Sequence, residues 1–176
     1  MQKLTFLISA LAFSVVAPAQ SPKDDAFIFD AINVKNTLQI IYPIKISNNI
    51  YTPYALRFTR PGDMAPSCAL INKLNSTKPL EMISPSDGQY GNCHQAIKPP
   101  VVVKIGKDFF ANYVYVIEDP RAEFETNYSI IKLHEKNFSQ CKNEDKIAYL
   151  IKKNVEFKFD IKKATELALK SKKCEI

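Results

Sequence analysis

The chain has 176 residues, a formal net charge of +6 at pH 7, 11 prolines, 4 glycines and no tryptophan. This length predicts one domain with a hydrophobic core of its own. The basic excess is modest, which argues against a nucleic-acid-binding protein. Beyond residue 20, no stretch is apolar enough to predict a membrane span, which needs about 20 apolar residues.

The N-terminus has the three parts of a secretory signal peptide. Lys3 gives the positive start, residues 4–16 form an apolar stretch, and Ala17-Pro18-Ala19 places small residues where a signal peptidase cleaves. The apolar stretch is too short to cross a bilayer core of ~30 Å. We therefore predict a signal peptide at 1–19 and a single mature domain at 20–176. Such a protein is periplasmic in a Gram-negative bacterium and secreted otherwise.

All four cysteines lie in the predicted mature chain, at Cys68, Cys93, Cys141 and Cys174. An even number in an oxidising compartment predicts two disulfides, for which three pairings exist. We favour Cys68–Cys93 and Cys141–Cys174, because each closes a loop of moderate length within one half of the chain. On the chain-entropy model each stabilises the fold by ~3 kcal/mol. A zinc site is disfavoured because no Cys-x-x-Cys motif or Cys/His cluster is present, so no metal is expected.

Short runs rich in Ile, Val, Phe and Tyr predict strands along most of the mature chain. These runs occupy Ala26–Val34, Thr37–Ser47, Tyr54–Thr59, Cys68–Leu74, Leu80–Ile83, Val101–Ile105, Phe109–Ile117, Tyr128–Leu133, Ile147–Ile151 and Val155–Phe159. Pro43 makes the second run an edge strand or a bulge. Ser84–Pro100 is predicted to be irregular.

Two of these runs predict a hairpin around Gly106-Lys107-Asp108. Its second arm, Phe109–Ile117, is apolar on both faces, which predicts a central strand covered on both sides.

One helix is predicted at the C-terminus, from Ile161 to Lys172. Asp160 is a favourable N-cap, and lysines follow in the last turn, where they interact with the helix dipole. We expect the lysines in and after this helix to form a solvated face; they are Lys162, Lys163, Lys170, Lys172 and Lys173. The alternatives are that they bind an acidic protein partner or an anionic envelope surface.

The fold class is therefore mainly β, a β-rich α+β protein. We expect an antiparallel sheet arranged as a sandwich, a barrel or a small irregular propeller, with this C-terminal helix.

Residues with the chemistry for catalysis are few. His134 begins a sequence like the zinc-binding His-Glu-x-x-His motif, but Phe138 stands where the second histidine must be. We expect His134 to be exposed at the end of a strand. Glu118, Glu123 and Glu125 could supply paired carboxylates, but a charged hairpin end is the simpler interpretation. No catalytic residue and no cofactor is therefore expected.

The most distinctive segment is a polar loop that ends at Cys93. Its candidate partner-binding residues are Ser84, Ser86, Asp87, Gln89 and Tyr90. A loop held at its base by a disulfide loses less entropy when it binds a partner's cleft. The loop resembles the Ser-Gly-x-Gly-x-x-Tyr loop with which periplasmic lysozyme inhibitors enter a lysozyme active site. Ser84, Ser86 and Tyr90 occupy comparable places, whereas Pro85 and Asp87 replace glycines.

In general character the chain resembles the periplasmic immunity proteins that accompany type VI secretion effectors. The shared features are a short signal, a β-rich mature domain of this size, two expected disulfides and no enzyme motif. The resemblance implies a non-enzymatic inhibitor that blocks a protein toxin, often a peptidoglycan hydrolase. The alternatives are an inhibitor of host lysozyme, and a periplasmic small-ligand-binding protein or an unrecognised hydrolase.

Export predicts a defined mature product. Protein recovered from the periplasm should begin near Gln20, and its mass should lack the hydrogens of four thiols. Intact-mass spectrometry before and after reduction measures both quantities. Free thiols in the native sample, or an N-terminus still at Met1, would contradict the prediction.

Overall fold

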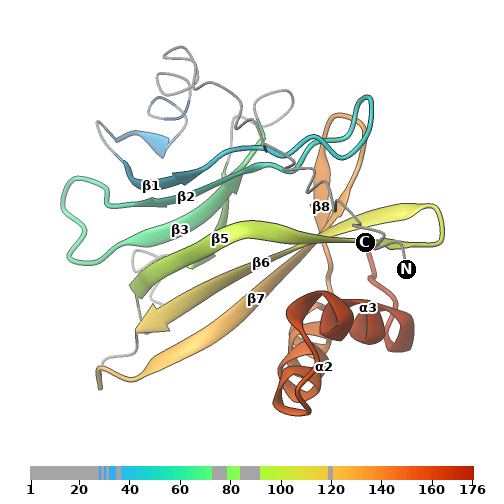
Figure 1. Ribbon diagram of the computed structural model, residues 1–176. Helices are drawn as coiled ribbons and strands as arrows, with labels where there is room; N and C mark the ends of the chain where they lie inside the picture. Colours follow the sequence, from blue (N-terminus) through green and yellow to red (C-terminus); the bar gives the residue numbers. More distant parts are fainter. Residues whose placement is uncertain are drawn as a thin grey trace, which may run out of the picture.

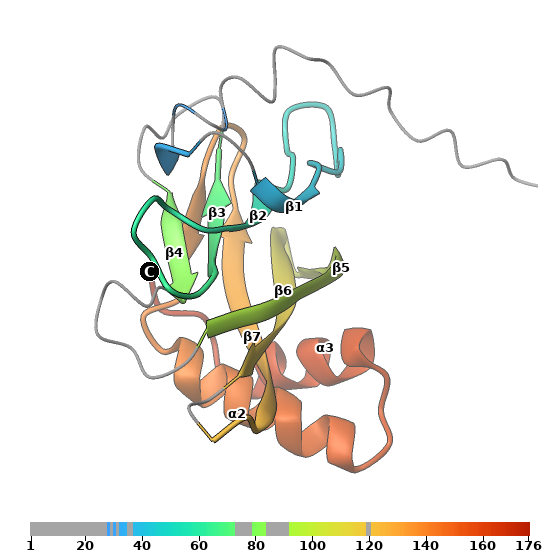
Figure 2. The ribbon, with the colours of Figure 1, turned by 90° about the vertical axis from the view of Figure 1, so that its left-hand side faces the viewer.

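The computed structural model describes residues 28, 30, 32–34, 37–72, 79–83, 92–118 and 121–176. The predicted signal peptide lies outside these residues. The described part contains two four-stranded antiparallel sheets and two helices. Figure 1 shows β1–β3 lying above β5–β7, with α2 and α3 below, and Figure 2 shows the same order of layers from the side.

Each sheet is a simple up-and-down arrangement of consecutive strands. Sheet 1 has the order β1 (Thr37–Ile41), β2 (Tyr54–Phe58), β3 (Ser67–Ile71) and β4 (Leu80–Ile83). Sheet 2 has the order β5 (Asn92–Ile105), β6 (Asp108–Glu118), β7 (Phe124–Leu133) and β8 (Phe138–Gln140). The helices are α2 (Glu144–Glu156) and α3 (Ile161–Ser171).

Successive side chains of a strand point to opposite faces of its sheet, and in both sheets the two faces carry apolar residues. Between the sheets, Ala55, Cys68 and Leu70 of sheet 1 share a buried cluster with Ala111 and Tyr113 of sheet 2. The other face of sheet 1 is covered by the N-terminal residues. That cluster comprises Ile28, Ile32, Val34, Tyr54, Leu56, Phe58, Ala69 and Ile71.

The helices cover the face of sheet 2 that is turned away from sheet 1. Val103, Phe110, Tyr128 and Ile130 of the sheet pack against buried side chains of α2 and α3. One polar pair lies within this contact, where buried Asn112 of β6 donates to Thr165 of α3 at 2.9 Å. A buried hydrogen bond of this kind helps to fix the register of a helix on a sheet, although Asn112 Oδ1 has no hydrogen-bond partner among the described residues.

Several bonds in addition to apolar contact join the two sheets. A disulfide connects Cys68 of β3 to Cys93 of β5. The backbone N–H of Cys93 donates to Pro66 at 2.9 Å, and its carbonyl accepts from Arg57 Nε at 2.8 Å. The buried Tyr113 hydroxyl donates to the Pro53 carbonyl at 2.9 Å. Burial raises the pKa of this hydroxyl, so it stays a neutral donor.

The predicted fold class is confirmed, as a pair of packed antiparallel sheets and not a closed barrel. Both predicted disulfides are present, with Cα–Cα distances of 5.6 Å for Cys68–Cys93 and 5.1 Å for Cys141–Cys174. The C-terminal helix begins where predicted, because the Asp160 side chain accepts from the N–H of Lys163. The 106–108 hairpin and the central position of β6 are also confirmed.

The strands predicted at Ile147–Ile151 and Val155–Phe159 are wrong, because this segment contains α2. Ile147 and Ile151 are spaced by four residues and are the buried positions of that helix. The helical period outweighed the β-branched composition. The same spacing explains the correction at Ala26–Val34, where the described residues Ile28, Asp30 and Ile32 are helical.

Part of the segment predicted to be irregular is strand, since β5 begins at Asn92 and continues through Pro100. Proline is tolerated here because β5 is an edge strand and its ladder with β6 is bulged between Ile97 and Val101. In sheet 1, β1 ends at Ile41, before Pro43, and is an edge strand as predicted.

The Cys141–Cys174 disulfide should hold α3 against the rest of the fold. It closes a loop of 33 residues, so replacing both cysteines with alanine should lower the free energy of unfolding by about 3–4 kcal/mol. Backbone hydrogens of α3 should then exchange faster than those of β6, because short helices depend on tertiary anchoring. Hydrogen–deuterium exchange measures this difference, and uniform acceleration across the fold would contradict the prediction.

Candidate functional site

The predicted partner-binding residues Ser84, Ser86, Asp87, Gln89 and Tyr90 lie outside the residues that the structure describes. The position where the chain leaves this loop is described, because β5 begins at Asn92 and Cys93 follows it. Asn92 pairs with Glu118, the last residue of β6. The loop therefore joins sheet 2 beside the β6–β7 turn.

We define the hairpin-end surface as His94, Glu118, Arg121, Glu123, Phe124 and Glu125. Glu118 ends β6, and Phe124 begins β7 directly opposite it. The His94 and Phe124 rings are in contact, with centroids 4.6 Å apart and planes inclined by 58°. His94 Nδ1 lies 3.6 Å from a Glu118 oxygen, and Asn92 donates to the same oxygen at 3.4 Å.

Phe124 is 59% exposed although it is large and apolar. Its backbone pairs with Glu118, and its ring contacts the His94 ring. His94 is held in turn, since it follows buried Cys93 and contacts Glu118. The surface therefore presents an aromatic side chain in a defined position, as protein-binding sites commonly do.

The carboxylates of the hairpin end each have a different partner. Glu123 forms an ion pair with Arg121 at 3.3 Å, and Glu125 forms one with Lys152 of α2 at 2.8 Å. The hydrogen bond with Glu125 raises the pKa of Lys152, so this lysine stays charged. The Glu125–Lys152 pair joins the hairpin to α2.

Glu144, in the first turn of α2, fixes the start of that helix to β7. Its carboxylate accepts from the backbone N–H of Ile130 at 2.5 Å and from the Gln140 side chain at 2.6 Å. Burial raises the pKa of Glu144, although these hydrogen bonds act in the opposite direction. These hydrogen bonds position the start of α2 on β7, and Lys152 of the same helix forms the ion pair with Glu125 of the hairpin.

His134 follows the end of β7, is exposed, and lies 3.1 Å from the Ser139 hydroxyl, as expected for a strand-end residue. Among the described residues, no three His, Cys, Asp or Glu side chains are placed to hold a metal ion. In the same residues, no helix is long and apolar enough to cross a bilayer.

Sequence reasoning missed Phe124, and it assigned His94 to the segment Ser84–Pro100 that was predicted to be irregular, whereas His94 belongs to β5. The available signal was an aromatic residue between two glutamates, at Glu123-Phe124-Glu125.

Comparisons of this chain with models of protein families, with curated proteins and with solved structures found no match.

The raised pKa of Glu144 predicts a pH-dependent contribution to stability. The folded state holds this proton more tightly than the unfolded state, whose carboxyl has a pKa of about 4.5. The contribution is therefore present below that pKa and is lost as the pH rises through the folded pKa. Glu144→Gln removes it, so wild type should lose stability relative to this variant as the pH rises from about 4 to 7.

Urea unfolding at a series of pH values measures the difference between the two proteins. Glu156→Gln, at an exposed position of the same helix, controls for the loss of one negative charge. A difference that stays constant with pH would show that Glu144 does not titrate abnormally.

Proposed function

We propose that this protein is a non-enzymatic periplasmic inhibitor, of the immunity-protein type, that binds and blocks a peptidoglycan-degrading toxin. Its binding site consists of the loop residues Ser84–Tyr90 together with the hairpin-end surface. The observation that carries the proposal is the exposed Phe124, held against His94 at the point where this loop rejoins sheet 2.

This arrangement suits an inhibitor because its side chains are held in place before the partner binds. Ordering flexible side chains at an interface costs roughly 0.5–1.5 kcal/mol each, and a surface ordered before binding avoids that cost. Cys93 ties the loop's end to sheet 1, and the Glu125–Lys152 pair supports the hairpin from α2. An element that enters an active site must keep its shape there, and these connections favour that.

Charge on the hairpin end is mixed, with Glu118, Glu123 and Glu125 beside Arg121 and His94. Such a rim tunes specificity more than affinity, whereas a central aromatic supplies most of the binding energy. Phe124, and Tyr90 from the loop, are the aromatic residues that we assign to that central role.

The two disulfides are compatible with export. Export and a wall-degrading target belong together, because peptidoglycan lies outside the cytoplasm.

The test is binding of the purified protein to a panel of peptidoglycan amidases, muramidases and animal lysozymes, with cell-wall hydrolysis measured in parallel. We expect tight binding to an amidase or muramidase toxin and loss of that toxin's activity. Phe124→Ala and Tyr90→Ala should each weaken binding by ~30-fold, corresponding to about 2 kcal/mol. Met64→Ala, which truncates an exposed apolar side chain elsewhere, should have no effect.

Two results would overturn parts of this proposal. Inhibition of lysozyme alone would move the target to a host enzyme. Inhibition that survives both aromatic substitutions in folded variants would place the interface elsewhere on the molecule.

A further inference from the structure

Basic and aromatic side chains alternate along one line of the outer face of α2, which ends at Phe157, the residue directly after the helix. Lys146, Tyr149, Lys153 and Phe157 follow one another at spacings of three or four residues, which places them on one side of the helix. All four are exposed. We call these residues the α2 stripe.

The aromatic side chains of the α2 stripe are largely exposed, Tyr149 by 65% and Phe157 by 68%. Phe159, in the connection to α3, is exposed as well. The buried side of the helix is satisfied separately, because Ile147 and Ile151 pack on sheet 2. The aromatic side chains therefore have no role in the core of the described protein.

Lysines in this region outnumber the acids that could neutralise them. Residues 142–176 contain ten lysines and six acidic residues. Two of those acids have other roles: Glu144 accepts from Ile130 and Gln140, and Asp160 caps α3. No described acidic group forms an ion pair with Lys146, Lys153 or Lys172.

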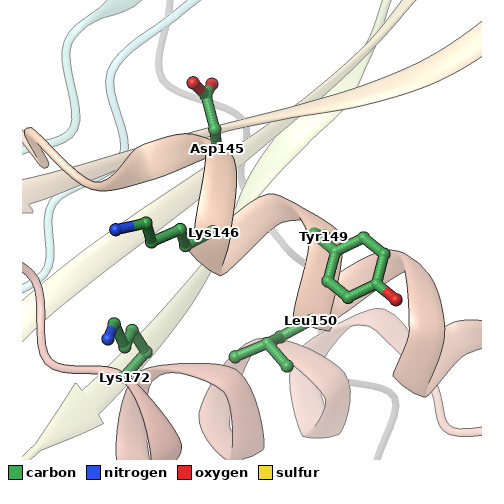
Figure 3. A pocket seen from close by; sticks show the side chains of 5 residues that line it. All are labelled: Asp145, Lys146, Tyr149, Leu150 and Lys172. Atoms are coloured by element: carbon green, nitrogen blue, oxygen red, sulfur yellow. The ribbon is translucent and has the colours of Figure 1, made fainter.

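A shallow hollow of about 390 Å³ lies at one end of the stripe, between α2 and the end of α3. Leu150 and Tyr149 supply its apolar lining, and the charged residues that line it are Lys146, Lys172 and Asp145. Figure 3 shows the two lysine side chains projecting on the same side, while Asp145 points away from Leu150 and Lys172. This combination suits a ligand with an anionic group joined to an apolar body.

We propose that the α2 stripe docks this protein on a bilayer that contains anionic phospholipids. The lysines face the phosphate groups, and Tyr149, Phe157 and Phe159 enter the headgroup region. Membrane-surface helices combine basic and aromatic residues in this way, and each lysine near an anionic surface adds to the attraction. The positive charge of Lys146 and Lys153, which form no ion pair with a described acidic group, complements the negative surface of such a bilayer. This proposal does not rest on the inhibitor function.

Vesicle co-sedimentation tests the proposal, with protein recovered from cells and its N-terminus checked by mass spectrometry. The probes are vesicles of phosphatidylcholine with phosphatidylglycerol, and vesicles of phosphatidylcholine alone. We expect binding to the anionic vesicles only, decreasing with added salt. Lys146→Glu with Lys153→Glu should weaken this binding by about tenfold or more.

A matched variant separates the stripe from the protein's overall charge. Lys45→Glu with Lys136→Glu makes the same change in net charge at exposed positions outside the helices, and should bind nearly as wild type does. Phe157→Ser with Phe159→Ser should also weaken binding, without changing its dependence on salt. Circular dichroism establishes that each variant is folded.

Equal loss of binding in both lysine variants would overturn the proposal, because it would indicate a general charge effect. Equal binding to both kinds of vesicle, or none to either, would overturn it as well. In the last case, retained inhibition of a wall hydrolase would leave the proposed function standing.

Discussion

Cys93 is the point on which the relative position of the two sheets depends. Its side chain is bonded to Cys68, its N–H donates to Pro66, and its carbonyl accepts from Arg57. These three links come from one fully buried residue, so sheet 2 cannot slide along sheet 1 without breaking a covalent bond. The constraint extends outward in both directions, because Asn92 and His94 beside it contact Glu118 at the hairpin end. The core and the candidate binding surface are thus held by the same residue.

Sheet 2 is packed on both of its faces. One face meets sheet 1, and the other supports α2 and α3. The buried Asn112–Thr165 bond and the Glu144–Ile130 bond give the helical layer a fixed register on this sheet. The hairpin end and the outer face of α2 are therefore two exposed surfaces on one framework, joined by the Glu125–Lys152 pair.

Sequence reasoning succeeded where one local signal dominated. The apolar run of β6 identified a covered central strand, and Asp160 identified the start of α3. It failed at Ile147–Ile151, where β-branched residues at helical spacing satisfy both patterns and only packing against sheet 2 decides. For the candidate site, the Cys68–Cys93 pairing and the anchored end of the loop were predictable. The His94–Phe124 contact was not, because it joins strands whose register depends on a bulge after Cys93.

The bulge in β5 limits pairing between the β5 edges of neighbouring copies of the protein. Lys98, Pro99 and Pro100 all stand opposite Tyr113, and Lys98 adopts a left-handed conformation with φ of 59°. β5 is a 14-residue strand at the edge of its sheet, a length that would otherwise template pairing with another chain. The prolines remove two backbone donors at mid-strand, and the bulge bends the edge out of plane. Neither half of the strand then offers a long, straight row of hydrogen-bonding groups, which protects neighbouring copies from joining edge to edge into fibres.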